Sequence, residues 1–286
     1  MNFSIVTPSL NQGRYLADCL ASVRAAAQGA PVGQASLRSV GSTSRRHRLS
    51  TNPIPAEDGS HPSPDPLRVQ HLVIDGGSSD STLSILRANP DIRWVSEPDR
   101  GQAHAINKGL AMSTGHILAY LCADDLYAPD ALEKVHAAFE QNPDADVVHG
   151  DFFFLEGSGR KRLKRSGPFS PDRLARGNFL GQPAVWWRRR VYEKFGGFDE
   201  SLHFCMDHEY WLRIADGTLW HYIPEPLASC RLHADAKTSR QLAAAWHETA
   251  QMLTREKFRL GPWWDYWNML VWGRHYYRAK RWWFGR

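Results

Sequence analysis

The sequence has few cysteines, and none of them forms a paired motif. Cys19, Cys122, Cys205 and Cys230 lie far apart, without a Cys-x-x-Cys pair. This spacing excludes a disulfide framework and a zinc site built from cysteine pairs, and it is typical of reduced thiols in a cytosolic protein. The first residues, MNFSIVTPSL, also lack the basic start and the long apolar core of a signal peptide.

Long apolar runs and the common nucleotide-binding motifs are missing as well. No apolar run reaches the roughly 18 residues that a membrane-spanning helix needs, so we expect a cytoplasmic protein. The sequence lacks Gly-x-x-x-x-Gly-Lys-Ser/Thr, His-Glu-x-x-His and Gly-x-Ser-x-Gly, and DGGSSDS (75–81) is not the Gly-x-Gly-x-x-Gly fingerprint. A bound diphosphate would therefore need another source of positive charge, such as a metal ion.

The overall composition is that of an ordinary globular protein. The 286 residues, of which 42% are hydrophobic and 23% charged, can form one large domain or two small ones. The net charge of +5 suits phosphate-bearing ligands or an anionic membrane surface.

Apolar strand patterns alternate with helical patterns along most of the chain. Strands are predicted over 3–7, 69–75, 92–96, 116–122 and 145–151, and helices over 15–23, 81–88, 101–113 and after Pro129. Asp80 is the expected N-cap of the second helix. Because the strands are apolar on both faces, the pattern predicts an α/β fold with a mostly parallel central sheet between helices.

Residues 28–67 interrupt this alternation. The segment contains six prolines and many serines and glycines, but no aromatic residue. Such a composition buries too little apolar surface to offset the entropy of ordering, so it predicts a disordered insertion. The basic stretch SRRHR (44–48) is read as part of a solvated loop in preference to a tether for nucleic acid or membrane.

Polar side chains recur where the predicted strands end. Ser9 and Asn11 follow the first strand, Asp75 ends the second, Glu97 and Asp99 follow the third, and Asp124 and Asp125 follow the fourth. In parallel sheets, ligands bind beyond the carboxyl ends of the strands, so these positions predict a site. The adjacent aspartates either cap the next helix or hold a divalent metal, which favours carboxylate oxygen.

Six blocks of sequence carry a resemblance to a known family. They are SIVTPSLNQGRYLADCLASV, HLVIDGGSSDST, SEPDRGQAHAINKGL, YLCADDLY, GQPAVWWRR and GGFDESLHFCMDHEYWLRIA. In this order they resemble glycosyltransferase family 2, whose members are inverting enzymes with the GT-A fold that use nucleotide-diphosphate sugars. The resemblance covers about residues 1–27 and 68–240.

The resemblance implies a role for each matching position. Asp207 falls at the place of the catalytic base, with Glu209 as its neighbour near the donor. Asp75 would accept a hydrogen bond from the imide of the base, which suggests a uridine or thymidine diphosphate donor. Asp124, Asp125 and His233 would hold magnesium or manganese. The remaining donor-site positions are Thr7, Pro8, Ser9, Asn11, Gly76, Ser78, Asp99, Arg100, Gln102, Asn107, Ala123 and Gln182.

One residue departs from the family pattern. Cys122 stands where the family has the first aspartate of its Asp-x-Asp motif. A thiol is a soft ligand and a poor match for magnesium, so Asp124 is expected to carry a weakly bound metal, with Asp125 as a helper or a cap. In the implied reaction, the metal offsets the charge on the leaving diphosphate while Asp207 deprotonates an acceptor hydroxyl.

The C-terminal segment 241–286 differs in composition from the domain predicted over residues 1–240. Between Trp263 and Phe284 it carries six of the twelve tryptophans, together with several arginines and lysines. This mixture predicts a helical extension that lies at a membrane interface, and a helix packed on the domain is the alternative. A peripheral position at the inner face of the cell membrane would bring the site close to a lipid-linked or saccharide acceptor.

Two other classes of function remain open at this point. The changed Asp-x-Asp motif is compatible with a non-catalytic nucleotide-sugar-binding or scaffold protein. The basic charge and SRRHR are compatible with a nucleic-acid-binding module, but basic and aromatic residues do not interleave on a regular element before the tail. No nucleic-acid partner is expected.

Overall fold

The computed structural model describes residues 1–28, 67–233, 236–237 and 241–255. The predicted insertion, apart from its first and last residues, and the aromatic, basic part of the tail lie outside these residues. The strands are β1 (Asn2–Ser9), β2 (Arg68–Asp75), β3 (Arg93–Ser96), β4 (Ile117–Tyr120), β5 (Leu126–Tyr127), β6 (Val147–Glu156), β7 (Lys161–Lys164), β8 (Val185–Arg188) and β9 (Trp220–Leu232). The helices are α1 (Gly13–Gln28), α2 (Thr82–Arg87), α3 (Gln102–Met112), α4 (Ala131–Gln141), α5 (Pro171–Arg176), α6 (Arg189–Phe195), α7 (Met206–Ala215) and α9 (Leu242–Arg255), with a 3-10 turn at Gln182–Ala184.

The strands form one mixed sheet in the order β3-β2-β1-β4-β8-β6-β9-β5, and β7 pairs with β6. β1, β2, β3 and β4 are parallel neighbours. β8 is antiparallel to both β4 and β6, so β6 again runs in the direction of β4, as does its parallel neighbour β9. The predicted α/β architecture is confirmed, and its strands are mostly of one direction. The inserted antiparallel strand β8 was not expected.

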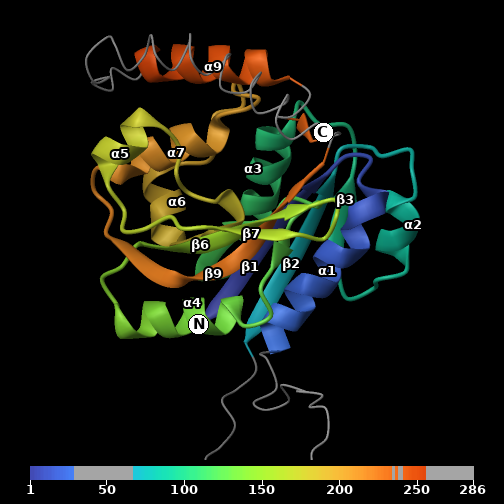
Figure 1. Ribbon diagram of the computed structural model, residues 1–286. Helices are drawn as coiled ribbons and strands as arrows, with labels where there is room; N and C mark the ends of the chain where they lie inside the picture. The colour runs from blue at the N-terminus through green and yellow to red at the C-terminus, as the bar shows by residue number, and fades with distance from the viewer. Residues whose placement is uncertain (29–66, 234–235, 238–240, 256–286) are drawn as a thin grey trace, which may run out of the picture.

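Helices cover both faces of this sheet (Figure 1). On one face, α3, α6 and α7 contribute Leu110, Val191 and Trp211 to a core that they share with β1, β2 and β4. On the other face, α1 and α4 contribute Val23 and Phe139. Strands enclosed in this way are apolar on both sides, which is why the sequence shows continuous apolar runs there.

The helix starts differ in detail from the sequence expectation. Ser81, and not Asp80, is the N-cap residue of α2, but Asp80 still accepts a hydrogen bond from the N–H of Thr82 at 2.9 Å. Pro129 precedes α4, which begins at Ala131. The local rules therefore place these two helices within a few residues of their true starts.

Helix α9 packs on the domain across the top of the view in Figure 1. Its Met252 and Leu253 are buried in the same core as Tyr210 and Trp211 of α7. The described part of the C-terminal segment thus shares the core of the main domain, and the division at residue 240 stays a prediction.

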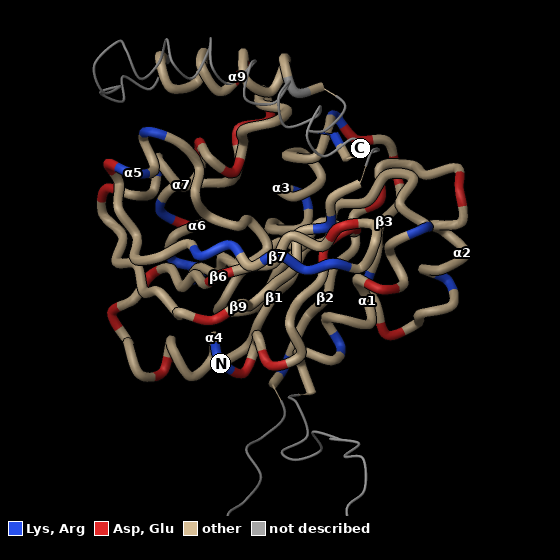
Figure 2. Tube along the Cα trace, in the orientation of Figure 1, with Lys and Arg blue, Asp and Glu red and all other residues tan. Residues whose placement is uncertain are grey.

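The positive charge of the chain is concentrated on particular elements. Figure 2 shows β7 as a run of Lys and Arg positions, and its Lys161, Arg162 and Lys164 are exposed. β7 lies at the side of β6, outside the main strand order. Charged side chains on such a strand oppose pairing with another chain.

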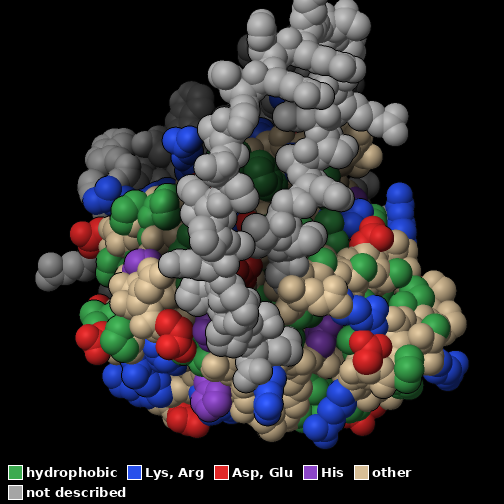
Figure 3. Space-filling view, turned by 90° about the horizontal axis from the view of Figure 1, so that it is seen from below, with side chains coloured by type: hydrophobic (Ala, Val, Ile, Leu, Met, Phe, Trp, Pro, Cys, Tyr) green, Lys and Arg blue, Asp and Glu red, His purple; other side chains and the backbone are tan. Residues whose placement is uncertain are grey.

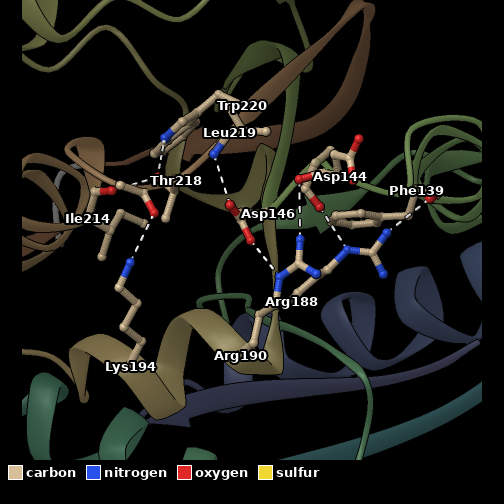
Figure 4. Close-up of polar contacts among 12 residues, drawn as sticks. Phe139, Asp144, Asp146, Arg188, Arg190, Lys194, Ile214, Thr218, Leu219 and Trp220 are labelled. Carbon is tan, nitrogen blue, oxygen red and sulfur yellow. Dashed lines mark hydrogen bonds and ion pairs between the residues drawn. The ribbon is translucent and has the colours of Figure 1, made fainter.

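The amino ends of the strands carry paired charges. The carboxylate of Asp146, just before β6, accepts from Arg190 Nε at 2.6 Å and from Leu219 N at 2.9 Å (Figure 4). Arg188 donates to the carbonyl oxygen of Phe139 at 3.0 Å. Figure 3, seen from this end of the molecule, shows Lys and Arg interspersed with acidic side chains.

Candidate active site

The loops after β1 and β2 are fastened to each other at the carboxyl edge of the sheet. The N–H of Asn11 donates to Ser78 Oγ at 2.7 Å, and Asn11 Oδ1 accepts from the N–H of Ser79 at 2.9 Å. Asn11 has a φ of 52°, a left-handed conformation that asparagine tolerates better than most residues. Asp80 also accepts from the N–H of Gly13 at 2.9 Å. These hydrogen bonds fix the two loops that would line the predicted nucleotide pocket.

Asp75 is fully enclosed by the protein. Its side chain is fully buried, and Oδ2 accepts from Ser78 N at 2.9 Å, Ser96 Oγ at 2.7 Å and Gly77 N at 3.2 Å. Its Oδ1 accepts from the hydroxyl of Ser78. The carboxylate therefore already organises the loop after β2, and its predicted contact with a nucleotide base stays a prediction.

The three residues at the end of β1 differ in what they offer to a ligand. Thr7 is buried and its hydroxyl is hydrogen-bonded to His71 Nε2 at 2.9 Å, so it belongs to the interior. Pro8 is buried as well. Ser9 is 4% exposed and its Oγ has no hydrogen-bond partner among the described residues. A buried hydroxyl of this kind at a strand end is available to a bound group.

Asp99 lies directly against the loop after β2. Its Oδ1 accepts from the N–H of Gly101 at 2.8 Å, and its Oδ2 lies 2.5 Å from the point where a Cβ on Gly76 would stand. A larger residue at position 76 would displace this carboxylate. Arg100, which is largely exposed, forms an ion pair with Glu200 at 2.6 Å.

Asn107 acts within the protein. Its amide donates to the carbonyl of Phe198 at 2.9 Å and accepts from the N–H of Phe198 at 2.8 Å. It also donates to Glu200 at 3.1 Å. Asn107 thus holds the segment that leads to α7, and its predicted place beside the donor stays a prediction.

Cys122 is held between two glutamines. Gln102 Nε2 donates to Cys122 Sγ at 3.1 Å, and Gln182 Oε1 lies 3.7 Å from the same sulfur. Gln182 is itself fixed by its bond to the carbonyl of Tyr120 at 2.7 Å. Burial, together with Asp125 and Asp124, raises the pKa of the Cys122 thiol well above its usual range. The neighbouring Ala123 points into the core with Leu16.

Cys122, Asp124 and Asp125 converge on one point. One ligand atom from each of these three residues lies within 4.8 Å of the others, a grouping suited to a metal ion. His233 extends the group, because its Nε2 is 2.9 Å from Asp124 Oδ2. Sulfur, carboxylate and imidazole together fit a divalent transition metal better than magnesium.

Arg231 of β9 holds the metal group in place by hydrogen bonds. The N–H of Arg231 donates to Asp125 Oδ1 at 2.9 Å, and Arg231 Nε donates to the carbonyl of Asp124 at 3.0 Å. Burial, followed by the charge of Asp124, raises the pKa of Asp125 well above its usual range. A cation bound here would oppose that shift. Asp125 therefore serves as a fixed member of the group as well as a candidate ligand.

Asp207 stands at the start of α7, apart from the metal group. Asn178 Nδ2 donates to Asp207 Oδ2 at 3.0 Å. Burial raises the pKa of Asp207, while the neighbouring His208 and the hydrogen bond from Asn178 oppose the rise. Its charge acts on Tyr120 and Cys230, which lie toward the carboxyl ends of β4 and β9. The structure thus brings Asp207 to the same edge of the sheet as the metal group.

Glu209 is not part of this group. It is 3% exposed, and both of its oxygens bind Arg213, at 2.6 Å and 3.1 Å. Arg213 in turn donates to the carbonyl of Gly197 at 2.7 Å. Glu209 therefore supports the chain before α7 from within the protein, and its predicted role at the donor is not supported by these contacts.

The segment that enters α7 is held by α9. The carboxylate of Glu248 accepts from the N–H groups of His203, Phe204 and Cys205 at 2.9 Å, 2.6 Å and 3.0 Å. Although burial alone would raise it, these donors hold the pKa of Glu248 below its usual range. Lys237 Nζ donates to the carbonyl of His203 at 2.5 Å.

Sequence reasoning missed four residues of this site: Asn178, Arg231, Lys237 and Glu248. All four act by contacts with residues far away in the sequence, which no local pattern reveals. Lys237 could have been noticed, because it lies four residues after the predicted metal ligand His233.

Comparison with known proteins decides the family. The family model described as glycosyl transferase family 2 matches residues 62–213. The chain belongs to glycosyl transferase family 2. An uncharacterized glycosyltransferase of Mycobacterium tuberculosis is 31% identical over 152 residues, which make up 52% of this chain and 58% of that protein. A PGL/p-HBAD biosynthesis glycosyltransferase of the same species is 30% identical over 148 residues, or 50% of this chain and 56% of that protein. The match thus spans little more than half the length of these family 2 relatives.

Similar solved structures confirm the GT-A fold. S. aureus TarS 1–349, in complex with UDP-GlcNAc, gives a TM-score of 0.60 at 14% identity and covers 92% of this chain and 68% of that chain. The mannosyltransferase PcManGT from Pyrobaculum calidifontis, in complex with GDP-Man and Mn2+, gives 0.58 at 18% identity and covers 91% and 65%.

The described helices give no sign of a membrane span. Within residues 1–28, 67–233 and 241–255, none combines the length and the apolarity that crossing a bilayer requires.

Proposed function

We propose that this family 2 chain is an inverting glycosyltransferase that moves a sugar from a nucleotide-diphosphate donor to an acceptor hydroxyl. The observation that supports it most is the presence of two distinct carboxylate sites at one edge of the sheet. One is the group of Cys122, Asp124 and Asp125 with His233 beside it, and the other is Asp207. Direct displacement needs a site for the leaving diphosphate and a base for the nucleophile.

The chemistry divides between these two sites. The acceptor oxygen attacks the anomeric carbon, the bond from that carbon to the diphosphate oxygen breaks, and the diphosphate leaves with the electron pair. Asp207 accepts the proton of the acceptor hydroxyl. Its raised pKa strengthens it as a base, while the hydrogen bond from Asn178 helps to keep it ionised. Attack from the face opposite to the leaving group inverts the anomeric centre.

Asp124 and His233, with Asp125 and Cys122, would hold a divalent metal, which supplies counter-charge to the diphosphate when bound. Magnesium and manganese are the proposed ions; the mixed donor set favours manganese of the two, and Cys122 weakens the binding of either. Substitution Cys122→Asp should tighten manganese binding in a calorimetric titration. Equal affinities of the variant and the wild type would remove position 122 from the metal site.

The proposed donor is a UDP- or dTDP-sugar. Support comes from the family resemblance at Asp75 and from TarS, whose structure was solved with UDP and UDP-GlcNAc. The enclosed state of Asp75 weakens the argument from that residue alone, and PcManGT was solved with GDP-Man. A donor screen must therefore include all three nucleotides.

The proposed acceptor is a saccharide or a lipid-linked saccharide in envelope or polysaccharide biosynthesis. The biosynthesis glycosyltransferases among the relatives support this class. The proposed peripheral position at the inner face of the cell membrane depends on residues 262–286, which lie outside the described residues. Full-length protein should sediment with anionic vesicles at low salt, and a form without residues 262–286 should not. Full-length protein that stays in the supernatant would contradict this position.

A non-catalytic nucleotide-sugar-binding protein is the second candidate, and Cys122 is the observation that favours it. A panel of UDP-, dTDP- and GDP-sugars, assayed for release of the nucleoside diphosphate with and without manganese, separates the two. Turnover of any donor supports the transferase. Binding without turnover of any donor, tested with a range of acceptors, favours the second candidate.

A further inference from the structure

Lys237 is a charged group that the proposed reaction has not used. Its Nζ donates to the carbonyl oxygen of His203 at 2.5 Å and lies 5.2 Å from the centre of the Phe204 ring. An ammonium group carries three donors, and this bond uses one of them. The segment that receives it is itself fixed by Glu248. Lys237 therefore has a defined position, and among the described residues its ammonium makes no second hydrogen bond.

The surroundings of His203 place Lys237 beside the donor side of the site. His203 Nδ1 lies 3.7 Å from the point where a Cβ on Gly101 would stand. Gly101 donates its N–H to Asp99, and the next residue, Gln102, donates to Cys122. Burial lowers the pKa of Lys237, and the carboxylates of Glu248 and Asp99 oppose this shift. The carbonyl that Lys237 binds thus belongs to a residue that also borders Gly101, beyond the end of the third strand.

The metal group lacks a carboxylate at position 122, where the family pattern has an aspartate. Cys122 offers a single soft sulfur atom in its place. A site with one carboxylate fewer binds a hard divalent cation less tightly. A diphosphate at this edge therefore needs further positive charge, and a partly desolvated ammonium with two spare donors can supply it.

We propose that Lys237 binds the diphosphate of the donor directly and supplies counter-charge that does not depend on the metal. This inference rests on the proposed transferase function and names a phosphate-binding residue for it. Lys237 compensates for the loss of the first aspartate of the metal motif. It should make diphosphate binding partly resistant to removal of the metal.

The test compares a nucleoside diphosphate with the matching monophosphate. Calorimetry measures binding of UDP and UMP, and in parallel GDP and GMP, to the full chain in EDTA and in manganese. The variants are Lys237→Met, Lys237→Arg and the control Lys194→Met. Lys194 is a matched control because its ammonium also donates to a backbone carbonyl, that of Gly217 at 3.3 Å, but at the amino ends of the strands (Figure 4).

We expect the loss of Lys237 to lower the affinity for nucleoside diphosphates but not for nucleoside monophosphates. In EDTA, Lys237→Met should weaken diphosphate binding about 10-fold or more, which corresponds to about 1.4 kcal/mol, while monophosphate binding changes little. Lys237→Arg should recover part of the loss, and Lys194→Met should behave as wild type.

Three outcomes would count against these ideas in different ways. Equal diphosphate affinity in Lys237→Met and wild type overturns the role of Lys237 alone. Equal loss of diphosphate and monophosphate affinity also overturns it, because it reveals a purely structural effect. Failure of the wild type to bind either diphosphate in either buffer contradicts the proposed function itself.

Discussion

At the amino ends of the strands, Asp146 is paired with the guanidinium of Arg190, whereas at the carboxyl ends Asp75, Asp99 and Asp207 are held by neutral donors. The first arrangement neutralises charge and fixes the chain. The second leaves these three carboxylates without a lysine or arginine partner among the described hydrogen bonds and ion pairs. Charge that is organised but not neutralised marks the end of the sheet where a ligand belongs.

The two aspartates of the metal group, like those at the other carboxyl ends of the strands, are not paired with an arginine side chain in the described contacts. Asp124 meets His233, and Asp125 meets the backbone N–H of Arg231. The guanidinium of Arg231 is directed to the carbonyl of Asp124 and to Asp18, at 3.0 Å and 3.1 Å. Neither carboxylate of the pair is neutralised by an arginine side chain in these contacts. Both are therefore available to a cation.

The largest effect of a substitution at the carboxyl ends of the strands is expected at Asp207. Substitution Asp207→Asn should lower the transfer rate by about 100-fold or more, because an amide cannot accept the hydroxyl proton. Binding of the nucleoside diphosphate should stay close to that of wild type. Steady-state kinetics and calorimetry on the same preparation measure both quantities. Normal turnover by this variant would show that another group is the base.

A smaller loss is expected at Glu248. Substitution Glu248→Ala leaves three backbone N–H groups before α7 without their acceptor, so the start of the helix that carries Asp207 should lose its fixed position. We expect the transfer rate to fall about 10-fold, the scale of 1.4 kcal/mol, and Glu248→Gln, which retains one oxygen, to recover part of it. If both variants fold and transfer at the wild-type rate, α9 does not position Asp207.

The smallest effect on rate is expected at Asn178 and depends on pH. Its hydrogen bond favours the ionised form of Asp207, so Asn178→Ala should raise the pKa of Asp207 further. Because the base must be ionised, the acid limb of kcat/KM should move to higher pH, by less than about one unit. The rate should fall on the acid side and change little on the alkaline side.

The control for Asn178 is Asn142→Ala. The Asn142 amide donates to the carbonyl of Ala138 at 2.9 Å in α4. If the acid limb shifts in this control, or does not shift in Asn178→Ala, the acid limb of kcat/KM does not report the ionisation of Asp207.

The fold was predictable because it depends on local patterns, and the same patterns indicate the edge of the sheet where the candidate site lies. Strands that are apolar on both faces, such as Ile117–Tyr120, predict a sheet covered by helices on both sides. Aspartates that follow strand ends, such as Asp99 and Asp124, predict which edge of the sheet binds the ligand. The antiparallel strand β8 follows from its pairing with β4 and β6, which no local pattern in Val185–Arg188 reveals.

The roles of single side chains were less predictable because the same residue type can serve the interior or the ligand. Glu209 has Arg213 four residues later on a helix, a spacing that favours an ion pair, and that pairing is what the structure shows. Asp75 is enclosed by Ser96, which lies 21 residues away. The support from Glu248 depends on the packing of α9, which was expected to lie outside the domain.

The most direct test of the account is a UDP titration of Asp124→Ala and Asp146→Ala in manganese, with GDP as the parallel ligand. Both variants remove one aspartate next to a strand, but at opposite ends of the sheet. Asp124→Ala should weaken diphosphate binding about 10-fold or more, a loss of about 1.4 kcal/mol. Asp146→Ala should lower the free energy of unfolding by about 1–3 kcal/mol and leave binding unchanged. Two results would contradict the assignment of the site to the carboxyl ends of the strands. One is unchanged diphosphate affinity in Asp124→Ala, and the other is a loss of diphosphate affinity in Asp146→Ala alone while that variant is still folded.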